Sequence, residues 1–196
     1  MEQLELVRNS FNESIQIKID SADALSEIIS DAGAVLTQAL VADHKILTCG
    51  THVEASLAQS FATLLLHQTQ RERPSLPAIC LSDNISLYSD ISEDTGTNEV
   101  FAKQVRALGN SGDVLITFSS DGNCFACAQA IRAALSKDLM IISLTGNDGG
   151  EIAGLTGPDE IEIRVPSGNP QRVSEVQLMI LNCLASQVDI NLFGDH

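Results

Sequence analysis

The stretch KILTCGTHVE, residues 45–54, shows the unit from which most of the chain is built. A short apolar run ends at Cys49, Gly50 allows a tight turn, and a helical pattern starts within four residues. Four further short apolar runs follow, separated by helical patterns. Such alternation is typical of right-handed βαβ units. The sequence therefore predicts an α/β fold, a three-layer doubly wound five-stranded parallel sheet.

The expected elements can be placed along the whole chain. Strands are predicted at Lys45–Cys49, Ala78–Leu81, Val114–Phe118, Met140–Leu144 and Ile161–Val165, and helices at Glu54–His67, Val100–Leu108, Asn123–Ser136 and Gln171–Asn191. Two extra N-terminal helices are expected within residues 1–43, the second starting after a cap at Asp20 or Ser21. These helices would pack on the sheet, form an oligomer interface, or both. Because no linker or repeat is visible, residues 1–196 are expected to form a single domain.

Composition narrows the classes of partner and the location. The net charge is −15, with only 11 Lys and Arg residues, so direct contact with nucleic acid is not expected. No apolar run reaches the roughly 20 residues of a membrane span, and residues 1–14 lack the pattern of a signal peptide. The five cysteines are scattered, which is typical of a cytoplasmic protein with reduced thiols. Basic proteins are the partners that this acidic charge favours.

Two strand-to-helix turns are candidate ligand sites, because open parallel sheets bind ligands at the carboxyl ends of their strands. The first covers residues 49–54, and the second is FSSDGNC, residues 118–124. The second turn combines hydroxyls, a glycine and a helix start, which is the chemistry of an anion-binding cradle. The same residue types also serve simply as helix caps, so the turn alone leaves both interpretations open.

Several segments resemble the SIS (sugar isomerase) family and, within it, the phosphoheptose isomerases. The resemblance covers nearly the whole chain and rests on residues 78–81, 100–109, 112–116, 144–150 and 161–167. Residues 72–79, ERPSLPAI, and residues 102–109, AKQVRALG, are more similar still to the DnaA initiator-associating proteins, a non-isomerase group of this branch. The resemblance implies the SIS fold, a homotetramer, and the replication initiator protein DnaA as a partner.

Four positions that carry acid–base residues in the isomerases hold other residues here. The His and Glu of the first crossover helix correspond to Ser60 and Leu64, and the Gln and His of the C-terminal helix correspond to Ser174 and Asn182. None of these side chains titrates near neutral pH, and none offers a metal ion an imidazole or carboxylate. The resemblance therefore implies no catalytic residue, no metal site and no cofactor.

The phosphosugar pocket is altered in the same way. The Ser that ends the family's first turn is replaced by Glu54, and the Ser that ends its second turn by Cys124. A carboxylate about 4 Å from a phosphate charge costs about 4 kcal/mol at an effective dielectric of 20, so a phosphorylated ligand is expected to bind weakly. Alternatively, Glu54 points outward and stabilises its own helix. The expected remnant of the pocket comprises Gly50, Thr51, His52, Glu54, Ser119, Ser120, Asn123 and Cys124.

Two further features allow functional interpretations. Cys124 and Cys127 form a C-x-x-C pair at a helix start, which would suit a redox site, although Cys124 stands at a family Ser position. Near the C-terminus, Leu192 and Phe193 are two large apolar residues in an expected polar tail. They would either fold back onto the helix or, as the resemblance implies, form an apolar pair that contacts DnaA.

The sequence is compatible with three functions. The favoured one is a non-catalytic regulator of chromosomal replication initiation, which binds DnaA as a homotetramer and promotes its assembly on the origin. The first alternative is a phosphoheptose isomerase that acts on sedoheptulose 7-phosphate with Glu54 or His52 as replacement groups. The second alternative is a phosphosugar-binding sensor without turnover.

Overall fold

The computed structural model describes residues 3–67 and 72–194. Its centre is a sheet of five parallel strands, as the sequence predicted, and the strand order is β2-β1-β3-β4-β5. The strands are β1 Ile46–Gly50, β2 Ala78–Cys80, β3 Val114–Phe118, β4 Met140–Gly146 and β5 Ile161–Val165. The strand order reverses between β1 and β3, where Gly50 is in register with Phe118 at the carboxyl end. A doubly wound sheet opens its ligand crevice at such a reversal.

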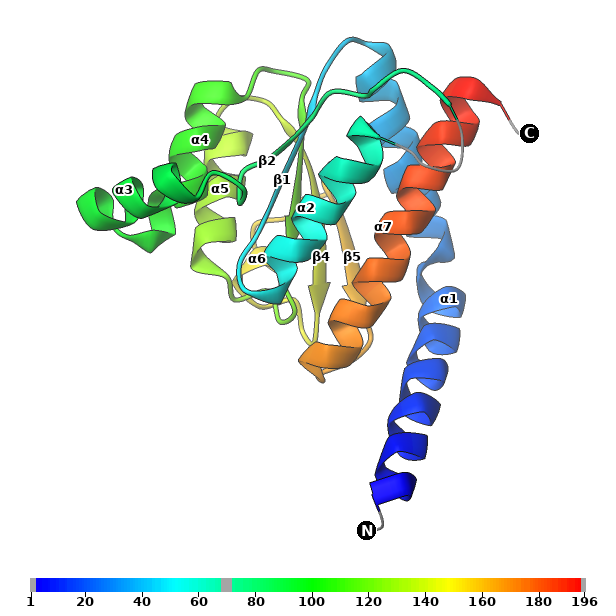
Figure 1. Cartoon of the computed structure of the whole chain (residues 1–196). Helices are drawn as coiled ribbons and strands as arrows, with labels where there is room; N and C mark the ends of the chain where they lie inside the picture. The colour runs from blue at the N-terminus through cyan, green and yellow to red at the C-terminus, as the bar shows by residue number, and fades with distance from the viewer. Residues whose placement is uncertain (1–2, 68–71, 195–196) are drawn as a thin grey trace.

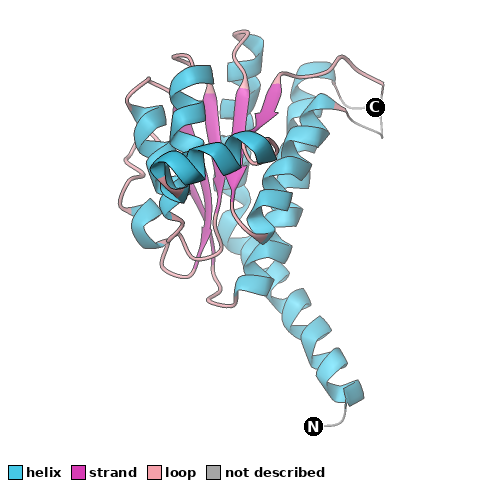
Figure 2. Ribbon diagram, turned by 60° about the vertical axis from the view of Figure 1, so that its left-hand side comes forward, coloured by secondary structure: helices cyan, strands magenta, loops and turns pink. Residues whose placement is uncertain are grey.

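Helices cover both faces of the sheet and give the predicted three layers (Figures 1 and 2). One face carries α1 Gln3–Val41, α2 Val53–Leu66 and α7 Pro170–Phe193, and the other carries α3 Ile85–Thr95, α4 Val100–Leu108, α5 Phe125–Leu135 and α6 Gly150–Ala153. The strands are apolar on both sides: Ile46 and Ile116 pack toward α1, α2 and α7, whereas Leu47 and Leu115 pack toward the other helices. Burial on both faces explains why the strands appear in the sequence as continuous apolar runs.

The N-terminal region forms one helix, so the prediction of two helices was wrong. α1 runs unbroken for 39 residues and passes through the expected cap at Asp20 and Ser21. An N-cap residue starts a new helix only where the chain has first turned, and residues 15–25 contain no Gly or Pro to favour a turn. Asp20 instead accepts a hydrogen bond from Gln16 one turn earlier (2.8 Å), and Ser21 is buried. α1 therefore continues without a break, and its N-terminal end projects beyond the rest of the chain (Figure 1).

The remaining boundaries lie close to the predictions, with three omissions. β3, β5 and α4 have the predicted bounds, and the other predicted elements differ by one or two residues at an end. The sequence analysis missed α3, α6 and a short 3-10 turn, η1 Thr97–Glu99. α3 begins after Asn84, whose side chain accepts a hydrogen bond from the Leu87 N–H (3.0 Å). This cap was a readable signal, because Asn is among the preferred N-cap residues.

The C-terminal segment corrects another expectation. Leu192 and Phe193 lie in the last turn of α7 and not in a polar tail. Both are half-buried and pack against the core between the sheet and α1, α2 and α7. The helix ends only at Gly194, where φ is 83°, a conformation that favours glycine. The pair is thus closer to the expected fold-back than to an exposed tail, and residues 195–196 lie outside the described residues.

Two helices, α1 and α7, are long and apolar enough to cross a membrane by length and composition alone. No segment of this kind was expected from the sequence, because polar residues interrupt the apolar runs of both helices. In the structure, α7 packs its apolar side chains on the sheet and against α1. A buried core helix has the same composition as a membrane span, so the criterion by itself does not distinguish the two.

Candidate functional site

Three cavities open around the carboxyl ends of β1 and β3. The main cavity, about 570 Å³, reaches α3 and η1, and the helix cavity, about 540 Å³, lies between the starts of α2 and α7. The cradle cavity, about 260 Å³, lies between the two turns that the sequence singled out. All eight residues of the expected pocket remnant line at least one cavity, and His52 lines all three. The residues that line the cradle cavity are Thr51, His52, Glu54, Ser119, Ser120, Asp121, Asn123 and Cys124.

The first turn is held by close backbone packing. A Cβ atom at Gly50 would lie 2.6 Å from the Glu54 carbonyl oxygen, so only glycine lets α2 start so near the end of β1. Ser82 braces the turn, because its hydroxyl donates to the Gly50 carbonyl (2.8 Å). His52 follows with φ 55° and ψ −126°, a conformation in which glycine is strongly preferred. The turn therefore holds an exposed imidazole in a strained backbone position.

The second turn uses its own polar groups to hold its shape. The Ser119 hydroxyl accepts a hydrogen bond from the Gly122 N–H (3.0 Å), and the Asp121 carboxylate accepts one from the Asn123 N–H (2.9 Å). Cys124 is the N-cap of α5, and its sulfur accepts from the Cys127 N–H (3.4 Å). These N–H groups are the donors that a bound anion would need. Their internal partners support the capping interpretation of this turn over the anion-cradle interpretation.

Glu54 lies in the first turn of α2 and is only 8% exposed. Glu54 lines both the cradle cavity and the helix cavity, and its burial opposes the alternative of an outward-pointing carboxylate. Among residues 3–67 and 72–194, no hydrogen bond or ion pair is formed by this carboxylate. Such a group disfavours a phosphate in the same space, because like charges repel strongly where water is scarce.

The thiols of the C-x-x-C pair are not activated. A side-chain hydrogen bond with the Cys127 thiol, together with burial, raises the pKa of Cys124 far above its ordinary value and outweighs the lowering effect of the Cys127 N–H. Cys124 in turn lowers the pKa of Cys127, but a hydrogen bond with Cys49, complete burial and the nearby Glu54 charge raise it more. A reactive thiol needs a lowered pKa, so these directions oppose the redox interpretation. In the described part of the chain, no group of three or more His, Cys, Asp or Glu side chains could hold a metal ion.

The four positions of the family's acid–base residues carry no such group in the structure. Ser60 donates its hydroxyl to the Ser56 carbonyl (2.7 Å), and Ser174 donates to the Pro170 carbonyl (3.0 Å). Asn182 similarly donates to a carbonyl of its own helix (2.7 Å), and Leu64 packs against the core. Only Ser174 of the four lines one of the three cavities. Within one chain, the three polar side chains are bonded to carbonyls of their own helices, and the four residues do not line one common cavity.

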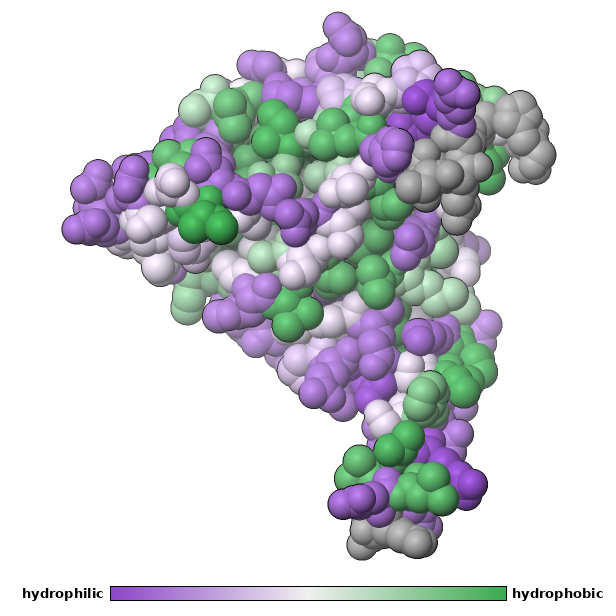
Figure 3. Space-filling model, in the orientation of Figure 1, coloured by the Kyte–Doolittle hydropathy of each residue, from purple (hydrophilic) through white to green (hydrophobic). Residues whose placement is uncertain are grey.

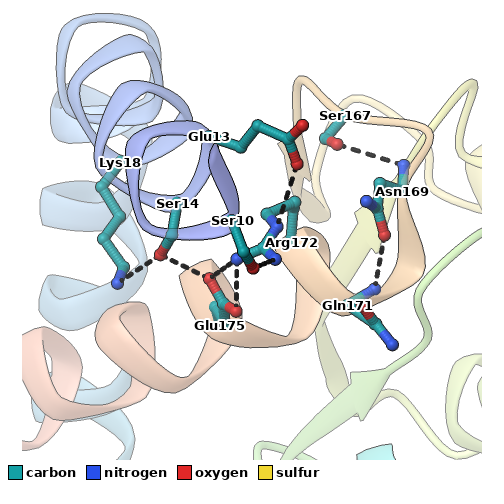
Figure 4. Close-up of polar contacts among 9 residues, drawn as sticks. All are labelled: Ser10, Glu13, Ser14, Lys18, Ser167, Asn169, Gln171, Arg172 and Glu175. Atoms are coloured by element: carbon teal, nitrogen blue, oxygen red, sulfur yellow. Dashed lines mark hydrogen bonds and ion pairs between the residues drawn. The ribbon is translucent and has the colours of Figure 1, made fainter. Parts of the chain in front are cut away.

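A buried polar network fixes the start of α7 against α1 (Figure 4). Arg172, 9% exposed, donates to both carboxylate oxygens of Glu175 (2.6 and 2.8 Å) and to the Ser10 hydroxyl (2.7 Å). Ser14 also donates to Glu175 (2.6 Å). Burial alone would raise the pKa of Glu175, but the Ser14 hydrogen bond and the Arg172 charge hold it below its ordinary value. The network thereby sets where the start of α7 meets the helix cavity.

Comparison with known proteins agrees with the fold. Residues 10–146 match the model of the SIS domain. The chain belongs to the SIS domain family. The structure of a phosphoheptose isomerase from Francisella tularensis aligns with a TM-score of 0.94 at 34% identity, covering 96% of this chain and 99% of that one. The corresponding values for phosphoheptose isomerase GmhA from Neisseria gonorrhoeae are 0.91, 34%, 95% and 98%.

Relatives of this SIS domain carry two different names. A phosphoheptose isomerase from Pseudoalteromonas atlantica is 48% identical over 192 residues, covering 98% of both chains. The DnaA initiator-associating protein DiaA from Enterobacter is 44% identical over 190 residues, covering 97% of both. The two identities are close, so overall similarity does not separate an isomerase from an initiator-associating protein. The distinction has to come from the residues of the site.

One wall of the main cavity of this SIS domain was not predicted from the sequence. Tyr88, Thr97 and Asn98 line it together with Ile85 and the predicted turns. These residues come from α3 and η1, which the sequence analysis left as a connection between β2 and α4. The sequence did contain one sign of α3: Tyr88 and Ile91 are spaced as on one face of a helix, and both contact the core beneath α4 and α5.

Proposed function

We propose that this SIS domain protein is a non-catalytic regulator of chromosomal replication initiation. It acts in the cytoplasm as a homotetramer, binds the initiator protein DnaA and promotes the assembly of DnaA on the origin. The observation that carries the proposal is the loss of acid–base chemistry at the crevice. Ser60, Ser174 and Asn182 are hydrogen-bonded to their own helices, and Leu64 packs against the core. An aldose–ketose isomerisation needs a general base and acid beside two adjacent carbons, and these positions supply neither.

The projecting end of α1 supports the proposed self-association. Apolar side chains recur at intervals of three or four residues along one face of this helix, and all of them are exposed: Leu4, Val7, Phe11, Ile15 and Ile19. Figure 3 shows apolar residues gathered on this projecting end. A helix face of this kind is typical of a helix–helix interface, because packing against a partner helix removes the apolar surface from water.

Tetramer formation would explain how a protein without catalytic groups promotes an assembly. Four identical copies present four equivalent surfaces for DnaA. After the first DnaA has bound, the next contact is made within the same complex, at a raised effective concentration. The net charge of −15 favours encounter with basic surfaces of the partner. The name DiaA among the relatives supports the choice of DnaA over other basic proteins.

We place the DnaA contact at the end of α7. Leu192 and Phe193 are half-buried, so part of each side chain remains available to a partner. Ile190 on the same turn is 48% exposed and extends this apolar surface. Apolar anchors that are already held by their own core lose little freedom on binding, which favours affinity.

A retention experiment tests the proposal. Immobilised wild-type protein is expected to retain purified DnaA, and a Leu192→Ala/Phe193→Ala variant is expected to retain much less. Because both residues also pack in the core, thermal unfolding is measured for each variant, and Ser186→Ala on the same helix serves as the control. Failure of the wild-type protein to retain DnaA, or undiminished retention by a folded double variant, would contradict the proposal.

The isomerase remains the second candidate, because His52 and Glu54 lie together on the turn that lines the cradle cavity. Imidazole and carboxylate groups are the usual general acids and bases. The assay is conversion of sedoheptulose 7-phosphate, for which we expect no turnover. Turnover that is abolished by both Glu54→Gln and His52→Asn would favour the isomerase. A sensor without turnover would instead show a ligand-dependent rise in melting temperature with the same phosphosugar.

A further inference from the structure

Glu54 is a buried anion that lacks a partner in the described part of the chain. It is 8% exposed and lies where the cradle cavity meets the helix cavity. A buried carboxylate is unfavourable unless a cation or hydrogen-bond donors compensate it. The N-terminus of α2 offers a partial positive charge, but this compensates only part of a full charge. The carboxylate is therefore poised to receive a donor from outside the chain.

The charges around Glu54 favour a cation over a phosphate. The cradle cavity is lined by two carboxylates, Glu54 and Asp121, and by no Lys or Arg among residues 3–67 and 72–194. Arg172, near the start of α7, is already engaged by Glu175 and Ser10. A phosphate dianion would meet two negative charges without a fixed cation to balance them. A protonated amine would meet the same two charges as attraction.

The hydrogen-bonding groups of the cradle cavity favour the same choice. The Gly122 and Asn123 N–H groups, which could have bound an anion, already donate to Ser119 and Asp121. Two backbone donors of this turn are thus used internally, whereas the Glu54 carboxylate remains as an acceptor. A ligand with several N–H donors fits this balance, and a ligand with only acceptor oxygens does not.

The adjoining main cavity indicates what the rest of the ligand would be. It shares Thr51, His52, Asn123 and Cys124 with the cradle cavity, so one molecule can extend into both. Of the residues that the structure describes, no Asp, Glu, Lys or Arg lines it. Besides the His52 imidazole, its polar groups are mainly hydroxyls and amides, such as those of Ser82 and Asn98, which bind neutral hydroxyl groups. Its volume of about 570 Å³ is in the range of a small-molecule site.

We infer that this crevice binds an amino sugar or a related polyol that carries a protonated amine and no phosphate. Glu54 receives the ammonium group in the cradle cavity, and the hydroxylated body lies in the main cavity. This inference does not depend on DnaA binding, which we place at the far end of α7. Glu54, at the position where the family carries a Ser, would thus make the same crevice favour a cationic ligand over an anionic one.

Ligand-dependent thermal unfolding and calorimetry test the inference with defined probes. Glucosamine, mannosamine and glucamine are compared with glucose and glucose 6-phosphate at pH 7 and constant ionic strength. At least one amine is expected to raise the melting temperature more than glucose, and glucose 6-phosphate least of all. Because a charge-assisted hydrogen bond is lost, Glu54→Gln should bind that amine roughly 10- to 100-fold more weakly. The matched control is Glu93→Gln on the exposed side of α3.

A second variant separates charge preference from general damage to the site. Glu54→Ser is expected to lose the amine and to gain measurable binding of glucose 6-phosphate, which a misfolded protein could not do. Far-UV circular dichroism establishes that each variant is folded. The inference is overturned if none of the three amines stabilises the wild-type protein. It is also overturned if Glu54→Gln binds the amine as tightly as wild type, or if the wild type prefers glucose 6-phosphate.

Discussion

Replacement of Arg73 by Ala should destabilise the protein strongly, because this side chain joins three segments of the fold. Its guanidinium donates to the Asp189 carboxylate on α7 (2.7 Å), and also to the Leu64 (2.7 Å) and Leu65 (2.8 Å) carbonyls at the end of α2. The side chain is only 2% exposed, and that of Asp189 is 6% exposed. Removing one member of a buried ion pair costs about 3–5 kcal/mol, because the other charge stays buried.

Urea and thermal unfolding at fixed protein concentration measure this effect. For a chain of this length, the loss corresponds to a fall in melting temperature of roughly 6–20 °C, at about 2–4 °C per kcal/mol. Arg106→Ala is the matched control, because its pair with Glu99 is exposed and should contribute only about 0–1 kcal/mol. Arg73→Lys should recover part of the stability, since an ammonium can reach Asp189 but cannot span the carbonyls as well. A loss no larger than that of Arg106→Ala would refute the reasoning.

Three further substitutions test other features of the fold and site. Burial raises the pKa of Asp113, but hydrogen bonds, chiefly from Lys45, outweigh it and leave the pKa lowered, so this carboxylate stabilises the fold above its unfolded pKa of about 3.9. Asp113→Asn should therefore cost about 2–3 kcal/mol in urea unfolding at pH 7, and the gap should narrow as the pH falls through the folded pKa. Gly122→Ala should cost about 2 kcal/mol or more by the same assay, because φ is 75° and the new Cβ would lie 1.9 Å from the Gly149 carbonyl oxygen. His52→Gly should leave stability unchanged or raise it by about 1 kcal/mol, since it relieves the strained φ of 55°; a clear loss would show that the imidazole makes stabilising contacts.

Most of the fold could be predicted because hydrophobic periodicity reports burial directly. β3 is buried at all five residues, so Val114–Phe118 reads as one apolar run with defined ends. The break expected at Asp20 and Ser21 failed for a different reason. Local cap preferences act over one turn, whereas α1 contacts α7 on both sides of that point, through Ser10 and Ser14 before it and through its buried C-terminal half after it. A tertiary contact of that kind leaves no local sign in the sequence.

The candidate site was predictable in position but not in its internal contacts. The strand ends placed the Gly50 turn and the Ser119 turn together, because both follow adjacent strands of a parallel sheet. Whether Ser119 and Asp121 bind a ligand or their own turn depends on side-chain torsions, which a residue list does not give. The structural role of Arg73 was similarly not predictable, because its partner Asp189 lies 116 positions away in the sequence.

The crevice and the fold respond differently to substitution at residue 54. The turn depends on Gly50, where any side chain would strike the backbone of α2, but residue 54 needs only to fit the first turn of a helix. The positive end of α2 offsets part of the cost of burying the Glu54 carboxylate there. The turn therefore depends on Gly50, whereas residue 54 can change without altering the path of the backbone. The inferred amine preference follows from residue 54 alone, so a SIS scaffold can change the ligand charge that it favours and still keep its architecture.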